Sequence, residues 1–182
     1  MLVMVGASAS GKTEISKMLI KHSRFKKMVT FTTRPIREGE KDGIDYYFLD
    51  KKAFLLKKDR GEFIETVEYA NHFYGTAFKE ASINSVLIVD PNGANVLNQK
   101  LDEETVFFYL EASEAVRTKR MKERGDHLRD IQTRIQKDRA IFHRDALDHV
   151  DYVINTNVKS LLALSNEIYS LYTHHIKKTI VK

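Results

Sequence analysis

The chain of 182 residues is 42% hydrophobic and carries 30 Lys and Arg against 25 Asp and Glu, a formal net charge of +5. This length and apolar content predict one globular domain, residues 1–182, with a sizeable core. The chain contains no cysteine, which excludes disulfides, thiolate metal sites and thiol nucleophiles. Its mild basicity suits phosphate ligands and does not by itself require a polyanion.

The apolar runs of the chain are all short. The first, at residues 2–5, is too short for a signal peptide or a membrane span, and no later run reaches the roughly 18 apolar residues of a span. Together with the absence of cysteine, these short runs predict a cytoplasmic protein that binds no membrane.

Short apolar runs alternate with helical patterns along the chain. The length and β-branched content of the runs predict buried strands at residues 2–5, 86–89, 106–110 and 152–154. Apolar spacing predicts helices at residues 14–22, at 128–142 with Leu128, Ile131, Ile135 and Phe142 on one face, and from a Ser160 cap through Leu161, Leu164, Ile168 and Leu171. The alternation predicts an α/β fold, a parallel sheet with helices on both faces.

The first predicted strand is followed at once by GASASGKT, residues 6–13, which matches a glycine, four further residues and Gly-Lys-Thr. Glycines permit a backbone path whose N–H groups converge on phosphate oxygens, and the next helix presents its positive N-terminus to the same anion. We expect ATP here, with Lys12 at its β and γ oxygens and the Thr13 hydroxyl on Mg²⁺. The alternative is an ordinary strand-to-helix turn. The expected ATP-binding residues of the loop are Gly6, Ala7, Ser8, Ala9, Ser10, Gly11, Lys12 and Thr13.

Residues 31–80 break the regular pattern, because they are rich in charged and aromatic side chains and are interrupted by glycines. Within them, the arginines and paired tyrosines of TFTTRPIREGEKDGIDYYF, residues 30–48, fit neither strand alternation nor helical spacing. We expect an inserted lobe whose crowded side chains bind something outside the chain.

That stretch, together with GEFIETVEYANHFYGT at residues 61–76 and VLIVDPNG at residues 86–93, resembles the guanylate kinase family. With the phosphate loop and the arginine-rich residues 117–134, the resemblance extends from residue 2 to about residue 155. It implies a phosphate-loop nucleoside monophosphate kinase in purine nucleotide metabolism, which transfers phosphate from ATP to GMP to give ADP and GDP. The implied parts are a core of about 1–30, 81–116 and 136–182, a GMP-binding lobe of about 31–80 and a helical lid of about 117–135.

The resemblance also implies the acceptor site. The GMP phosphate is assigned to Arg34, Arg37, Tyr46 and Tyr74, and the base to Thr30, Glu65, Thr76 and Asp90. Arginine forks and tyrosine hydroxyls suit a phosphate dianion, and a carboxylate can accept from the N1–H and 2-amino groups of guanine, which adenine lacks. Alternatives stay open: the arginines could be a solvated surface pair, one of Tyr46 and Tyr47 is expected in the core, and Asp90 could serve Mg²⁺ through water.

For the lid, the resemblance assigns catalytic roles to Arg120, Arg124 and Arg134 beside Lys12, and it places Asn155 near the adenine. The alternative is a basic helix that touches nucleic acid. However, residues 117–139 contain no aromatic residue on which bases could stack. We therefore expect the small molecules ATP and GMP as partners, Mg²⁺ as cofactor, no nucleic acid, and a monomer or homodimer.

Three positions depart from the family pattern. Ile88 stands two before Asp90, where an acidic residue is usual; Ala9 replaces a third loop glycine; and the lid is one residue shorter between Arg124 and Arg134. These departures leave two alternatives to the ATP:GMP phosphotransferase: a kinase of another small phosphate ester, and a non-catalytic binding module. The intact Gly11, Lys12 and Thr13 argue against the module, and Glu65 with Thr76 argues against another acceptor.

Overall fold

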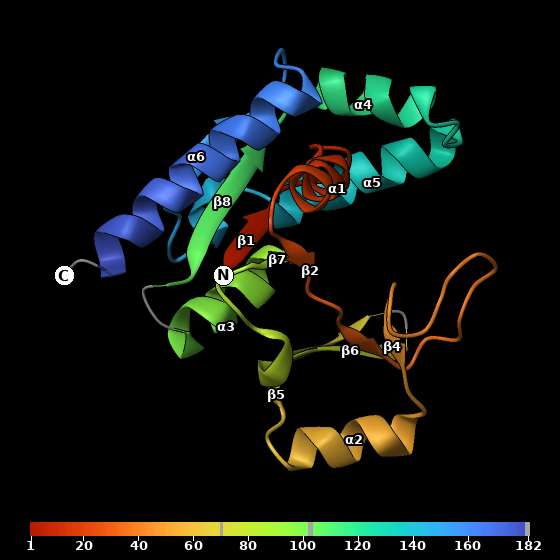
Figure 1. Ribbon diagram of the computed structural model, residues 1–182. Helices are drawn as coiled ribbons and strands as arrows, with labels where there is room; N and C mark the ends of the chain where they lie inside the picture. The colour runs from red at the N-terminus through yellow and green to blue at the C-terminus, as the bar shows by residue number, and fades with distance from the viewer. Residues whose placement is uncertain (70, 102–103, 181–182) are drawn as a thin grey trace.

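The computed structural model of the chain describes residues 1–69, 71–101 and 104–180. Within these residues the strands form two sheets (Figure 1), one of five strands in the order β2-β7-β1-β8-β9 and one of four strands in the order β4-β3-β6-β5. Figure 1 shows the smaller sheet and α2 on one side of the main sheet, and α4 and α6 on the other. No helix in the described residues is long and apolar enough to cross a membrane.

The main sheet is parallel throughout, as the sequence predicts. Its strands are β2 (Lys26–Lys27), β7 (Ser85–Ile88), β1 (Leu2–Val5), β8 (Val106–Glu111) and β9 (Tyr152–Asn155). In the register of the central strand, Val3 lies opposite Leu87 on one side and Phe107 on the other. Strands covered on both faces read as continuous apolar runs, which explains why four of the five were predicted and the lysine pair of β2 was not.

Alternate residues of β1 enter two different cores. Leu2 and Met4 pack with residues of α1 (Lys12–His22) and α6 (Leu161–Ile180), including Leu164. Val3 packs on the opposite face with Leu97 of α3 (Pro91–Lys100). The predicted helices on both faces of the sheet are therefore confirmed.

Several helices, but not α1, begin at a polar residue whose side chain caps the first turn. The Ser160 hydroxyl accepts from the Ala163 N–H at 3.2 Å before α6, as predicted. The Ser113 hydroxyl does the same for α4 (Glu114–Glu123), and the side chain of Asp90 caps α3.

The buried face of α5 (Leu128–Ile141) starts at Ile131. Leu128 shares the apolar spacing that predicted this helix, but it is 64% exposed.

The small lobe, residues 31–80, has an aromatic core of its own. It contains β3 (Phe31–Thr32), β4 (Tyr47–Phe48), α2 (Lys51–Asp59), β5 (Phe63–Tyr69), β6 (His72–Ala77) and a short 3-10 turn, Phe78–Glu80. The Phe54 ring stacks on Phe63 at 4.7 Å and on Phe73 at 5.6 Å between centroids. Tyr47 stacks on Phe31 at 4.7 Å, so it is the core member of the tyrosine pair.

Candidate active site

The phosphate loop, residues 6–13, leads from β1 into α1 through residues with positive φ, which is 156° at Gly6, 59° at Ala9 and 104° at Gly11. Position 6 requires glycine, because a Cβ there would lie 2.5 Å from the carbonyl oxygen of Leu110. Gly11 is the N-cap of α1. The first-turn N–H groups of a helix have no intrahelical partner, so they can bind an anion at this point.

Lys12 folds back over the loop that carries it. Its Nζ donates to the carbonyl oxygen of Ala7 at 2.8 Å and to that of Gly6, and it lies 5.8 Å from the centroid of the Phe142 ring. Burial lowers the pKa of Lys12 to about 8, against the opposing effect of the Asp138 carboxylate. The loop therefore keeps a half-buried cation at neutral pH, next to the helix N-terminus.

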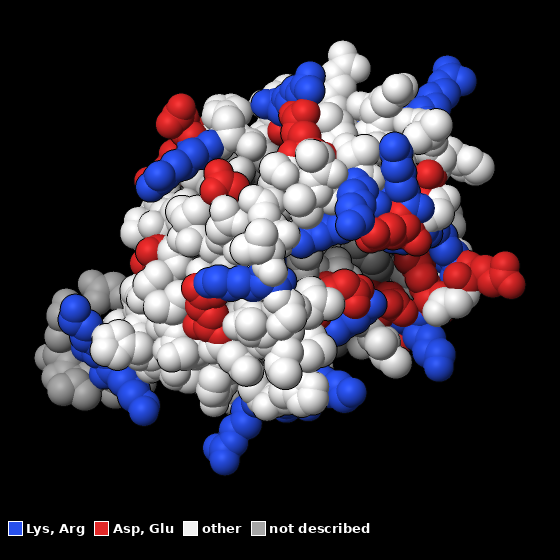
Figure 2. Space-filling model, turned by 90° about the horizontal axis from the view of Figure 1, so that it is seen from above, with Lys and Arg blue, Asp and Glu red and all other residues white. Residues whose placement is uncertain are grey.

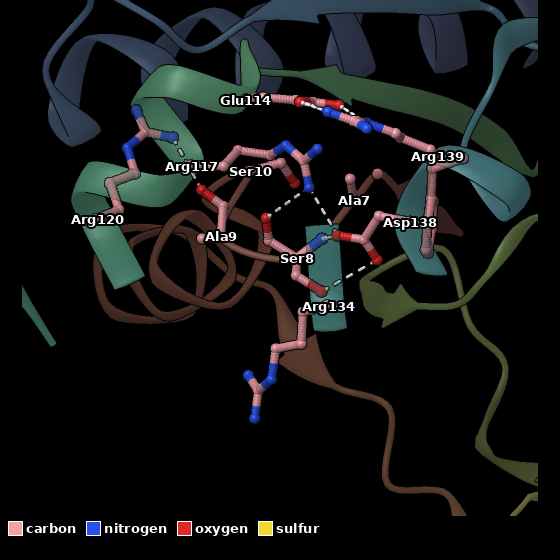
Figure 3. Close-up of polar contacts among 12 residues, drawn as sticks. Ala7, Ser8, Ala9, Ser10, Glu114, Arg117, Arg120, Arg134, Asp138 and Arg139 are labelled. Carbon is pink, nitrogen blue, oxygen red and sulfur yellow. Dashed lines mark hydrogen bonds and ion pairs between the residues drawn. The ribbon is translucent and has the colours of Figure 1, made fainter. Parts of the chain in front are cut away.

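Arg120 of α4 and a threonine after β9 hold the next part of the loop. The guanidinium of Arg120 donates from Nη1 to the Ala9 carbonyl at 3.1 Å (Figure 3). It also donates from Nη2 to the Thr156 carbonyl. The Thr156 hydroxyl donates to the Ser10 carbonyl at 2.8 Å. Thr156 was missed by the sequence reasoning, and its place two residues after the strand predicted at residues 152–154 was the available signal.

A cavity of about 510 Å³ opens beside the phosphate loop, and we call it the loop cavity. Its lining combines loop residues with arginines of α4: Ala9, Gly11, Lys12, Thr13, Arg120 and Arg124. Figure 2 shows basic and acidic side chains gathered around a hollow on the face that it presents. The structure thus brings together four of the eight loop residues predicted for ATP and two of the three predicted lid arginines.

Asp126, which the sequence reasoning missed, contacts two of the predicted lid arginines. Arg124 donates from Nε to Asp126 at 2.9 Å, and Nη1 of Arg134 lies 3.6 Å from the same carboxylate. The hydrogen bond from Arg124 lowers the pKa of Asp126. The side chains of Arg124 and Arg134 are 54% and 52% exposed, so both can move without disturbing a core.

Asn155 and Arg134 lie outside the loop cavity as its described lining defines it. Asn155 is exposed at the end of β9, and its side-chain oxygen accepts from the Asn157 N–H at 2.9 Å. It is the neighbouring Thr156 that contacts the loop. The expected contact of Asn155 with adenine stays a prediction.

A second cavity of about 180 Å³ lies between the small lobe and the end of β7, and we call it the lobe cavity. It is lined by six of the eight residues assigned to the acceptor, Thr30, Tyr46, Glu65, Tyr74, Thr76 and Asp90. They come from separate segments, with Glu65 on β5 opposite Thr76 on β6 and Asp90 at the start of α3. Segments 60 residues apart in sequence therefore form one polar pocket.

Two carboxylates dominate the lobe cavity. The Thr76 hydroxyl donates to Glu65 at 2.7 Å. Burial raises the pKa of Glu65 above its ordinary value; the Thr76 hydrogen bond opposes this effect and the negative charge of Asp90 adds to it. Asp90 Oδ1 accepts from the Gly93 N–H at 2.8 Å and so caps α3. The other carboxylate oxygen, Oδ2, takes no part in this capping bond.

Arg34 and Arg37 differ in their surroundings. Arg34 is 8% exposed, its Nη2 lies 2.7 Å from the Glu40 carboxylate, and its guanidinium carbon is 5.5 Å from the centroid of the Tyr46 ring. Arg37 is exposed, and its backbone N–H donates to the same Glu40 at 2.8 Å. A solvated surface pair is therefore wrong for Arg34. Glu40, which the sequence reasoning missed, links the two positions.

Comparison with known proteins now identifies the family. A guanylate kinase family model matches residues 1–163. Guanylate kinases of Thermotoga maritima and Synechococcus are each 34% identical, over 90% and 89% of this chain and 83% and 78% of theirs. The crystal structure of guanylate kinase from Anaplasma phagocytophilum is 26% identical with a TM-score of 0.66, over 96% of this chain and 84% of that chain.

The chain belongs to the guanylate kinase family. The structure shows where two of its departures from the family pattern fall. Ile88 lines the lobe cavity beside Glu65 and is 37% exposed, so an apolar side chain stands where a carboxylate is usual. Ala9 adopts a left-handed φ of 59°, a conformation that costs a residue with a side chain about 1 kcal/mol.

Proposed function

We propose that this enzyme of the guanylate kinase family transfers the terminal phosphoryl group of ATP to GMP and releases ADP and GDP. One observation carries the proposal most strongly. A phosphate loop with a half-buried lysine and a separate pocket with two carboxylates lie at the carboxyl ends of neighbouring parallel strands, β1 and β7. Open α/β sheets bind ligands at that edge, so a donor and an acceptor can meet there.

ATP binds on the donor side through the phosphate loop. Its β and γ phosphates lie on the N-terminus of α1, and Lys12 exchanges its contacts with the loop carbonyls for phosphate oxygens. The loop cavity receives the rest of the nucleotide between the loop and α4. Asn155 is proposed on the adenine side.

The residues present suit Mg²⁺, which prefers oxygen ligands and usually takes only one or two from the protein, with phosphates and water completing its shell. The Thr13 hydroxyl lines the loop cavity in the first turn of α1 and is the proposed ligand. When bound, the ion neutralises charge on the phosphates. Asp90 lies in the lobe cavity beside Glu65, which favours guanine as its partner.

The lobe cavity recognises guanine. The Glu65 carboxylate accepts from N1–H and the 2-amino group, and the Thr30 hydroxyl is left to donate to O6. The Thr76 hydroxyl, which donates to Glu65, holds that carboxylate toward the base. Adenine would place the lone pair of its N1 against the carboxylate. Pockets built around such hydrogen bonds discriminate by about 10⁴ or more, because the wrong base leaves buried polar groups unpaired.

The GMP phosphate is held by Arg34 and Arg37, with the hydroxyls of Tyr46 and Tyr74 completing its shell. Arg34 is positioned in advance by Glu40 and by the Tyr46 ring. Because Arg37 is exposed, it can move to the ligand.

Transfer needs no general base, since the second pKa of a phosphate monoester is about 6 and the attacking oxygen is already mostly ionised at pH 7. Catalysis rests on alignment and charge neutralisation. Lys12, Arg120, Arg124 and Arg134 supply the cations around the transferred group. Closure of a lid at about residues 117–135 over the small lobe at about 31–80 excludes water, which would otherwise accept the phosphoryl group.

The test is a coupled assay of ADP release with GMP, AMP, UMP or no acceptor. We expect rapid release with GMP and at least about 10³-fold lower kcat/KM with AMP. Equal turnover with AMP and GMP, or release that does not depend on acceptor, would remove GMP from the proposal. The cytoplasmic setting and the monomer or homodimer stay predictions.

A further inference from the structure

A buried ion pair lies behind the phosphate loop, and it is part of neither cavity described above. Arg117 of α4 is 4% exposed and Asp138 of α5 is 6% exposed, and Arg117 Nη1 lies 2.6 Å from Asp138 Oδ2. The sequence shows them only as two charges among many in the basic segment. In the structure they face the same loop residue, Ser8.

Asp138 holds Ser8 at two points (Figure 3). The Ser8 backbone N–H donates to Oδ2 at 2.9 Å and its hydroxyl donates to Oδ1 at 3.2 Å. Arg117 Nη1 lies 3.4 Å from the Ser8 carbonyl oxygen. Every polar group of Ser8 is thus in contact with this pair, which comes from helices 109 and 130 residues away in sequence.

The pair is poorly explained as a device for stability alone. Burying two ions costs several kcal/mol per ion, and apolar pairs of similar volume often serve as well or better. Arg117 Nε is buried with no hydrogen-bond partner among the described residues, so the cost is only partly offset. The same two helices are already joined at the surface by Arg139 and Glu114, through bonds of 2.7 and 2.6 Å.

We propose that Asp138 and Arg117 are positioning residues that hold Ser8 and thereby fix the shape of the phosphate loop relative to α4 and α5. The proposal rests on the proposed function only in taking the loop as the triphosphate site. The pair fixes one end of the loop as Arg120 and Thr156 fix the next carbonyls. Because α4 and α5 carry Arg120, Arg124 and Arg134, the loop and the cations that face the transferred group are kept in register.

The decisive variant is the double substitution Arg117→Met with Asp138→Leu. It replaces both ions at once, so it leaves no unpaired buried charge and should keep the helices packed. We expect it to unfold cooperatively at a temperature near that of the parent but to bind ATP about tenfold more weakly, measured by calorimetry without GMP, while the Kd of GMP stays within about twofold. A parent-like ATP Kd, or an equal loss for both nucleotides, would overturn the positioning role.

The matched control is Glu114→Gln with Arg139→Gln, which removes the surface pair between the same helices without touching the loop. It should bind ATP like the parent. If it lost as much ATP affinity as the buried double variant, helix packing rather than the hold on Ser8 would be responsible, and the proposal would fail.

A second measurement distinguishes the hydrogen bonds between Ser8 and Asp138 from a direct contact of Ser8 with the nucleotide. Ser8→Ala removes one hydrogen bond and leaves both ions paired; we expect about threefold weaker ATP binding in the parent and no further loss in the Arg117→Met, Asp138→Leu background. An equal loss of ATP affinity in both backgrounds would show that Ser8 does not act through its hydrogen bonds to Asp138. Since these are binding measurements without acceptor, they are independent of whether GMP proves to be the acceptor.

Discussion

The two cavities proposed to bind ATP and GMP are built in different physical ways. Around the phosphate loop, side chains hold the backbone from behind, and the ligand is offered N–H groups, a helix terminus and Lys12. In the lobe cavity the ligand is offered side chains directly, two carboxylates and several hydroxyls. The loop therefore depends on backbone shape, and the lobe cavity depends on the identity of a few polar atoms.

The first way to test this difference is to remove the one side chain on which the loop cavity relies. Lys12→Met should lower kcat by about 10³-fold, because a preorganised cation at the transferred phosphoryl group is lost. The free energy of unfolding should change by less than about 1 kcal/mol. The variant loses the hydrogen bonds to the loop carbonyls, but it also avoids the cost of removing an ammonium group from water. Steady-state kinetics and urea unfolding check both. The exposed Lys17 on the same helix offers the control Lys17→Met, expected to be parent-like.

Gly6→Ala attacks the backbone shape itself. The added Cβ would meet the Leu110 carbonyl oxygen at 2.5 Å and the Ser10 hydroxyl at 2.9 Å. We expect about 3 kcal/mol of lost stability in urea unfolding and a large loss of ATP affinity, because the loop must move away from β8. Gly39→Ala is the matched control: it also has positive φ, 82°, but no atom within 4 Å of the new Cβ. If both variants lost the same stability, φ alone would account for Gly6.

Glu65→Ala tests the side-chain character of the lobe cavity. It should weaken the binding of GMP about 10²-fold, because two hydrogen bonds to the charged Glu65 carboxylate are lost. The Kd of ATP should stay within about twofold. Glu68→Ala, at an exposed position of the same strand, should change neither. Calorimetry with each nucleotide decides the matter. Equal weakening of ATP and GMP would show that Glu65 supports the fold rather than reading the base.

These outcomes bear on how much the sequence could predict. The phosphate loop and four of the five described strands of the main sheet follow from local patterns, since a run such as Leu2–Val5 and a cap such as Ser160 are recognisable within a few residues. α2 was not predicted, although Asp50 caps it, because only Phe54 of its apolar residues is buried. Its place depends on the aromatic core of the lobe.

The site divides in the same way. Lys12 and Thr13 are recognisable from the loop alone, whereas Glu65 and Thr76 came only through a family resemblance. Three carboxylates that contact the arginines were missed: Glu40, Asp126 and Asp138. Asp138 was missed because its contacts are tertiary, since Ser8 lies 130 residues away. Glu40 and Asp126 contact arginines only six and two residues away, but in a charged segment nearness in sequence does not show which acid pairs with which arginine. No local spacing distinguishes such a carboxylate from a solvated one.

The pH dependence of binding should have opposite signs at the two cavities. Lys12 has a folded pKa of about 8, so raising the pH through 8 removes its charge in the free enzyme and weakens ATP, by up to about tenfold per unit. The same lowered pKa means that the folded protein binds fewer protons than the unfolded chain between about pH 8 and the ordinary value of 10.5. Stability from this group therefore rises with pH in that window.

For the lobe cavity the probe is guanosine, which has no phosphate to titrate. The raised pKa of Glu65 means that lowering the pH protonates it above the ordinary value of 4.5 and weakens guanosine. At pH values between 4.5 and the raised pKa of Glu65, the folded protein binds more protons than the unfolded chain. The stability that Glu65 contributes therefore falls as the pH rises through this range. Glu65→Gln should make guanosine binding independent of pH. ATP and guanosine affinities that moved in the same direction would contradict the two assignments.

The smallest expected effect concerns Ala9. With φ at 59° it carries left-handed strain of about 1 kcal/mol that glycine would not, while glycine adds unfolded-chain entropy worth about 0.4–1 kcal/mol. Ala9→Gly should therefore stabilise the protein by at most about 0.6 kcal/mol and leave the Kd of ATP unchanged. Ala7→Gly in the same loop, where φ is not positive, should destabilise by about 0.5–1 kcal/mol. Thermal unfolding with and without ATP checks both, and a gain from Ala7→Gly would show that the loop is strained beyond its positive-φ positions.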